Sequence, residues 1–136
     1  EVPVSLYRLS LEPSTDHAIA TAQKIADVPQ IPRPTSGHRM KNPRYGRYGS
    51  QVTAMDIARD GSAAMILTYS HAYRFPRNSG ESWEDVFRKS PEPIPLPPMR
   101  QAESVCFAPD GTSIYVTSEQ RPNPLHRLFL ELPGGD

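Results

Sequence analysis

Residues 51–61 read Gln-Val-Thr-Ala-Met-Asp-Ile-Ala-Arg-Asp-Gly, and residues 101–111 read Gln-Ala-Glu-Ser-Val-Cys-Phe-Ala-Pro-Asp-Gly. In each stretch a short strand-like segment leads into an Asp-Gly turn, and a second apolar segment follows the turn. An Asp-Gly pair between two such segments predicts a β-hairpin. The two stretches align without a gap, fifty residues apart, so the chain contains two copies of one hairpin.

Further strands flank both hairpins. The segments 6–9, 72–75 and 125–128 share an apolar–polar alternation around an arginine, and each fits the third strand of a sheet. Residues 19–28 and 94–98 suit outer strands, and the prolines of 94–98 fit there because proline is tolerated at a sheet edge. The predicted order is therefore a third and fourth strand, then a complete set of four, then a first, second and third strand.

A repeat of about 50 residues built from four antiparallel strands is typical of β-propeller blades. We predict an all-β chain that forms one propeller segment: a partial blade over 1–28, a long basic loop over 29–50, a complete blade over 51–98 and a partial blade over 99–136. Propellers close with about four to eight blades, so the ring is incomplete. The remaining blades, from a longer polypeptide or from other copies, are the expected partners. A small open sheet domain with two similar hairpins is the alternative.

One short helix is expected at residues 82–89. Ser82 is a favourable N-cap residue, with acidic residues in the following turn and basic residues at the end. Trp83, Val86 and Phe87 follow helical spacing and form one apolar stripe. The helix would lie between the third and fourth strands of the complete blade, on its outer rim, with Trp83 covering the blade edge.

Composition excludes some classes of function. The formal net charge is zero, which disfavours nucleic acid as a partner of the whole molecule. No apolar run approaches the roughly 20 residues of a membrane span, so we expect a soluble protein and leave cytoplasm, periplasm and secretion open. Cys106 is the only cysteine, which excludes an internal disulfide, and we expect it to pack within a sheet.

The candidate ligand site lies in the loops. In a propeller, the connections into the first strand and between the second and third strands emerge on one face, at the mouth of the channel. Residues 37–50 belong to this face and combine four basic residues with two tyrosines, a composition that suits an anionic small molecule or, alternatively, ion pairs with neighbouring blades. The ligand-binding candidates on this face are Arg47, Tyr48, His71, Arg100, Glu103 and Glu119.

Residues 100–119 carry a resemblance to known families. The segment Ala-Glu-Ser-Val, followed by Ala-Pro-Asp-Gly-Thr-Ser-Ile-Tyr-Val-Thr-Ser-Glu, resembles the blade consensus of bacterial propellers of the WD-repeat-like, lactonase-type and phytase-like esterase groups. The resemblance implies that Glu103 could be a metal ligand, with calcium as the metal, because calcium-dependent lactonase relatives use a channel-facing glutamate early in a blade. No cofactor is otherwise implied.

Two functions therefore remain open. Zinc-ligand spacing, a phosphate-binding glycine loop and a Gly-x-Ser-x-Gly elbow are absent from the sequence. This favours a binding or assembly scaffold with a ligand at the channel mouth. The alternative is part of a propeller hydrolase of the lactonase or esterase kind, in which calcium could assist.

Overall fold

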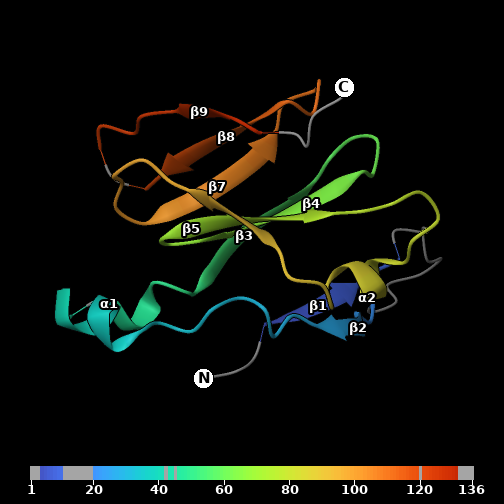
Figure 1. Ribbon diagram of the computed structural model, residues 1–136, viewed down its shortest axis with the longest axis horizontal. Helices are drawn as coiled ribbons and strands as arrows, with labels where there is room; N and C mark the ends of the chain where they lie inside the picture. Colours follow the sequence, from blue (N-terminus) through green and yellow to red (C-terminus); the bar gives the residue numbers. More distant parts are fainter. Residues whose placement is uncertain (1–3, 11–19, 42, 45, 120, 132–136) are drawn as a thin grey trace.

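The chain folds into three antiparallel sheets that stack in sequence order (Figure 1). The computed structural model describes residues 4–10, 20–41, 43–44, 46–119 and 121–131. Its strands are β1 (Ser5–Arg8) and β2 (Gln23–Asp27) in sheet A, β3 (Val52–Ile57), β4 (Ala63–Thr68), β5 (His71–Pro76) and β6 (Glu92–Pro95) in sheet B, and β7 (Ala102–Phe107), β8 (Ser113–Ser118) and β9 (His126–Phe129) in sheet C. The predicted all-β fold with antiparallel sheets and an incomplete ring is confirmed.

The strand positions differ from the predicted segments by only a few residues. The segment predicted at 19–28 forms β2 from Gln23, and Ile19 lies outside the described residues. The segment predicted at 94–98 forms β6 two residues earlier, from Glu92 to Pro95, at the edge of sheet B. Its two prolines fit there because an edge strand needs hydrogen bonds on one side only.

The two hairpins are copies in structure as well as in sequence. Met55 faces Ile66 across β3 and β4, and Val105 faces Val116 across β7 and β8, each fifty positions further along. The register shift between Val52 and Ala54 recurs between residues 102 and 104. A shift of the strand pairing by one residue would move every side chain to the other face of the sheet. An identical register therefore means that equivalent residues face equivalent directions.

The Asp-Gly turns have the same hydrogen bonds in both copies. The carboxylate of Asp60 accepts from the backbone N–H of Ser62 at 3.0 Å, and Asp110 accepts from Thr112 at 3.0 Å. Gly61 and Gly111 have φ angles of 70° and 69°, a left-handed conformation that glycine adopts without steric cost. Bonds from the side chain and backbone of Ser62 lower the pKa of Asp60 below its ordinary value, and bonds from the backbone and side chain of Thr112 lower the pKa of Asp110.

Two apolar cores lie on opposite faces of sheet B. The first joins Tyr73 and Phe75 of β5 to Val28 and to the partly buried side chains of sheet A. The second joins Met65 and Leu67 of β4 to Val105, Ile114 and Val116 of sheet C. Sheet B is therefore the central layer. Its strand β4 is buried along its whole length, which explains why β4 is apolar from Ala63 to Leu67 rather than alternating.

Two polar contacts hold the first strand of sheet B beside the first strand of sheet C. The Thr53 hydroxyl donates to the carbonyl of Ala102 at 2.7 Å, and the Asp56 carboxylate accepts from the backbone N–H of Phe107 at 2.8 Å. Both bonds join β3 to β7, which pack side by side. A hydrogen bond to a charged acceptor contributes about 1.5–3 kcal/mol.

Helix α2 (Trp83–Val86) lies between β5 and β6, at the position predicted for the single helix. Ser82 caps it by accepting from the backbone N–H of Asp85 at 3.1 Å. Phe87 packs against Phe75 and Trp83, with ring centroids 4.8 and 5.9 Å apart. Trp83 is covered by the guanidinium of Arg77 at 4.9 Å, so this ring is used for packing at the edge of sheet B.

The segment between sheets A and B contains more helical structure than the predicted loop. Helix α1 (Ser36–Lys41) and the 3-10 turn η1 (Gly46–Tyr48) both lie within residues 29–50. The polar, proline- and glycine-containing sequence has no apolar stripe of the kind that predicts α2, since Met40 is the only large apolar residue of α1 and is exposed. Within the described parts of the chain, no helix has the length and apolar character needed to cross a membrane.

Candidate functional site

Loops from different sheets meet at one end of the stack. Figure 1 shows η1, the β4–β5 turn and the start of β7 at the same end, opposite the turn that joins β3 to β4. The Ser70 hydroxyl of the β4–β5 turn donates to the carbonyl of Gly49 at 2.7 Å, which joins this turn to the segment before β3. We call this end the loop end. The predicted candidates are placed on or near it as follows.

Glu103 and Glu119 lie close to the phenol of Tyr69. Glu103 belongs to β7, Tyr69 follows β4, and Glu119 follows β8, so three strand ends contribute. A hydrogen bond with Glu103 raises the pKa of Tyr69 above its ordinary value of 10.0, and burial and the charges of Glu103 and Glu119 act in the same direction. Tyr69 therefore remains neutral at pH 7 and can donate its proton in a hydrogen bond to the Glu103 carboxylate.

His71 is held in place by its neighbours. Its Nδ1 lies 3.0 Å from the hydroxyl of Ser70, and its ring is tilted against that of Tyr73 with 6.0 Å between centroids. Its backbone N–H donates to the Thr68 hydroxyl at 3.1 Å. Because Ser70 of the β4–β5 turn also bonds Gly49, the imidazole lies beside the contact between this turn and the segment that joins η1 to β3. His71 is half-buried, which suits a positioned polar group at this end.

Arg47 and Tyr48 form a separate part of the site. The guanidinium of Arg47 lies over the ring of Tyr48 at 4.7 Å from its centroid. Both residues line a groove of about 610 Å³ between sheet A and the start of β3. The groove combines basic and apolar groups, and its lining includes Arg33, Ile31, Val28, Val4 and Val52. An anion with an apolar part would match this lining.

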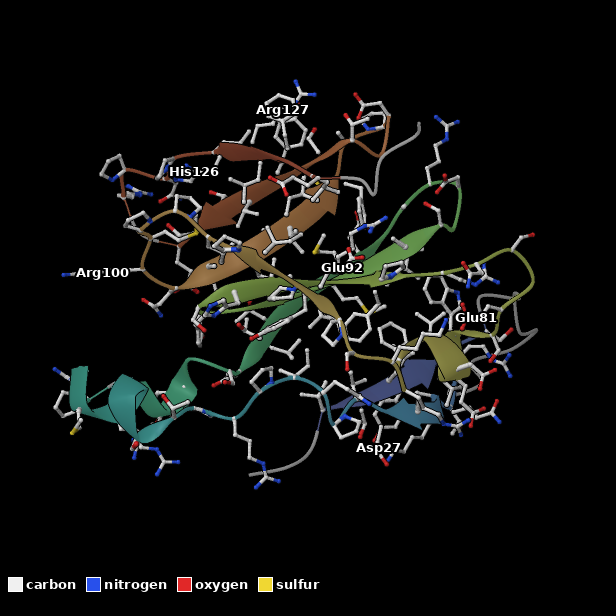
Figure 2. All side chains as sticks on the ribbon, viewed as in Figure 1. Asp27, Glu81, Glu92, Arg100, His126 and Arg127 are labelled. Atoms are coloured by element: carbon white, nitrogen blue, oxygen red, sulfur yellow. The ribbon has the colours of Figure 1, made fainter. Side chains whose placement is uncertain are left out.

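Arg100 extends away from these groups. In Figure 2 its side chain points outward from the turn that precedes β7, and the residue is exposed. The next residue, Gln101, has a positive φ of 49°, which is uncommon for a residue with a side chain. The side-chain amide of Gln101 bonds the Tyr69 phenol. This strained turn therefore contributes to the cluster formed by Tyr69, Glu103 and Glu119.

Sequence reasoning selected the loops but missed two of the residues that build the site. Gln101 was overlooked as a partner of Tyr69, because a strained backbone conformation leaves no composition signal. Arg33 was overlooked because it lies in a proline-rich stretch that reads only as a connection. A cation isolated among prolines was the available signal for Arg33.

The described side chains do not form a complete metal site. Across residues 4–10, 20–41, 43–44, 46–119 and 121–131, no group of three or more histidine, cysteine, aspartate or glutamate side chains converges. Calcium takes six to eight oxygen ligands. Glu103 and Glu119 could supply two carboxylates, so further oxygen ligands would have to come from outside this group.

Cys106 is exposed on β7, contrary to the expected packing within the sheets. The residue occupies the position of Asp56 in the other copy, on the face of sheet C that points away from sheet B. It therefore belongs to neither of the two cores.

The comparisons with known proteins give no relative for this chain. No protein-family model, no curated protein and no solved structure matches it.

Proposed function

We propose that the chain is a segment of a β-propeller that serves as a binding and assembly scaffold, with its ligand at the loop end. The observation that carries this proposal is the repeated stacking of sheets B and C. Their innermost strands, β3 and β7, lie side by side and are joined by the Asp56 and Thr53 hydrogen bonds. Sheets that touch by their inner strands and repeat one register favour radial packing around an axis.

The ligand we infer is a small anion with an apolar part, held in the groove by Arg47 and Arg33. A guanidinium presents several donors in a plane and binds carboxylate or phosphate with two parallel hydrogen bonds. Tyr48 lies beneath the Arg47 guanidinium and fixes its orientation. The carboxylates of Glu103 and Glu119 lie near Tyr69, and none of the described residues that line the groove is an aspartate or glutamate.

Titration calorimetry with citrate, inorganic phosphate and benzoate tests this proposal. We expect Arg47→Ala to weaken binding of the best of these anions at least about tenfold, the loss of one charge-assisted contact. Arg59→Ala is the matched control, because Arg59 is an exposed arginine in the β3–β4 turn at the opposite end. If Arg47→Ala and Arg59→Ala bind every tested anion equally, the groove is not the anion site.

A second function, a propeller hydrolase, is favoured by the Tyr69 group. Two carboxylates beside a phenol, at the ends of β4, β7 and β8, could bind calcium together with ligands from other blades, and calcium would polarise a substrate carbonyl. We expect calcium to raise the melting temperature of the chain and Glu103→Gln to remove that increase. A melting temperature that calcium leaves unchanged would contradict the calcium-dependent version of this function.

A further inference from the structure

One face of β3 is apolar and open, although the equivalent face of β7 is covered. Met55 and Ile57 are 37% and 43% exposed, whereas Val105, the counterpart of Met55, is 6% exposed. Phe107, the counterpart of Ile57, packs against the second core. The β-bulge between Val52 and Ala54 brings Val52 to the same face as Met55 and Ile57, and we call these three side chains the β3 face.

The equivalent face of β7 is covered by the β3–β4 hairpin of sheet B. Met65 and Leu67 of β4 pack in the same core as Val105, and Ala54 of β3 is partly buried against that core. The hairpin also supplies the Asp56 carboxylate to the backbone N–H of Phe107. The second copy thus shows which kind of structure fits on this face of the repeat.

Strand β3 has a backbone N–H at the position equivalent to the Phe107 N–H that bonds Asp56. The Ala58 N–H bonds the carbonyl of Ala63 at 2.9 Å, and hydrogen-bonded and non-bonded pairs alternate in an antiparallel ladder. Ile57 opposite Ala64 is therefore a non-bonded pair, and its N–H points away from β4. The same geometry directs the N–H of Phe107 toward Asp56. An occupant with a carboxylate at the position equivalent to Asp56 would accept a hydrogen bond from the backbone N–H of Ile57.

Sheet A leaves room for such an occupant. Figure 1 shows β1 and β2 on the side of the stack that carries α2. Among the described strands, β1 pairs only with β2, so no described strand lies along its other edge, which we call the free edge of β1. Tyr7 on β1 is also exposed. A strand added beside β1 would extend sheet A toward the β3 face, since Val4 next to β1 and Val52 of β3 lie near each other.

We propose that the β3 face and the free edge of β1 bind a β-hairpin of the β3–β4 kind from a partner polypeptide. Its outer strand pairs with β1, and its inner strand covers Met55 and Ile57 and directs an aspartate to the N–H of Ile57. A second copy of this chain is a poorer match, because its open hairpin face, on sheet C, has Cys106 where the aspartate is needed. The inference names the partner for the assembly role proposed above and rests on it.

The test uses a synthetic hairpin with the sequence of residues 50–69, cyclised to hold the turn, titrated calorimetrically into the 136-residue chain. We expect saturable binding that Met55→Asp weakens at least tenfold. Leu125→Asp is the matched control, since Leu125 is an exposed apolar residue, 67% exposed, that follows β8. A probe with Asp56→Ala should bind several-fold more weakly than the probe with the natural sequence.

Two readouts decide the result even if Met55→Asp fails to fold. In the unaltered chain, bound probe should slow hydrogen exchange at the Ile57 amide, and exchange that stays unchanged would overturn the proposal. Equal weakening by Met55→Asp and Leu125→Asp would also overturn it, as would dimers of the chain alone that Met55→Asp disrupts. Anion binding at Arg47 is measured in a separate titration. A failure of the anion proposal can therefore be distinguished from a failure of the hairpin proposal.

Discussion

The two hairpins have the same register, the same bulge and the same turn, yet their equivalent residues have different environments. Val105 and Phe107 lie in a core, whereas Met55 and Ile57 are partly exposed to solvent. Asp56 bonds the neighbouring sheet, whereas Cys106 is exposed. The difference arises from the neighbour on each side rather than from the hairpin. Local sequence determines the hairpin, and the adjacent sheet determines how much each face is buried.

The largest predicted effect is a difference between two aspartate substitutions. Val105→Asp would place an unpaired charge in the core between sheets B and C, and we expect it to lower the free energy of unfolding by about 4 kcal/mol or more. Met55→Asp should lower it by less than about 1 kcal/mol, because the side chain reaches solvent. Urea denaturation followed by circular dichroism measures both values. Equal losses would show that the β3 face is buried.

The second prediction concerns the contact between sheets B and C. Asp56→Ala leaves the N–H of Phe107 without its acceptor, and we expect a loss of about 2 kcal/mol. Cys106→Ala, at the equivalent position of the second copy, should change stability by less than about 0.5 kcal/mol. The same urea titration applies. If Cys106→Ala were as costly as Asp56→Ala, the two positions would share one environment.

The third prediction compares the arginines of the third strands. The side chain of Arg74 is 11% exposed and pairs with Glu92 of β6 at 2.7 Å, whereas that of Arg127 is 43% exposed and lies 3.8 Å from Asp110. We expect Arg74→Ala to cost about 1 kcal/mol and Arg127→Ala about 0.3 kcal/mol, because exposed ion pairs contribute little. Thermal denaturation of both variants gives the comparison, and the reverse order would contradict it.

The smallest effect concerns pH and is the same in both copies. Turn hydrogen bonds lower the pKa of Asp60 and Asp110 below 3.8 in the folded chain, so the unfolded chain binds protons first as pH falls. The stabilisation is therefore present above about pH 4 and is lost as pH decreases through the folded values. We expect Asp60→Asn and Asp110→Asn each to reduce the fall in melting temperature between pH 6 and pH 3. A fall that stays unchanged in both variants would contradict the turn bonds.

Much of the fold could be predicted from the sequence because its signals are local. The Asp-Gly turn requires glycine at a positive φ, and the alternation around it defines both strands, so the hairpins at residues 51 and 101 were found directly. The Ser82 cap and the stripe of Trp83 and Phe87 gave α2 in the same way. Helix α1 and the 3-10 turn η1 were missed because their polar sequences have no apolar stripe like that of α2.

The candidate site was less predictable because it depends on contacts between sheets. The sequence places Glu103 at the start of a strand, but the bond to Tyr69 depends on how the β4–β5 turn lies against sheet C. Arg100 and Arg47 have the same composition signal, yet Arg100 points outward and Arg47 lines the groove. The exposure of Cys106 similarly depends on which face of sheet C has a neighbour.

The central claim is that equivalent faces of the two hairpins differ only because one has a neighbouring hairpin. Amide hydrogen exchange of the isolated chain, followed by NMR, tests this at Ile57 and Phe107 directly. We predict that the Phe107 amide, which bonds Asp56, exchanges at least about a hundredfold more slowly than the Ile57 amide, as expected for a closed and an open site. Similar slow exchange at both amides would contradict the account, because the N–H of Ile57 would then already have a partner.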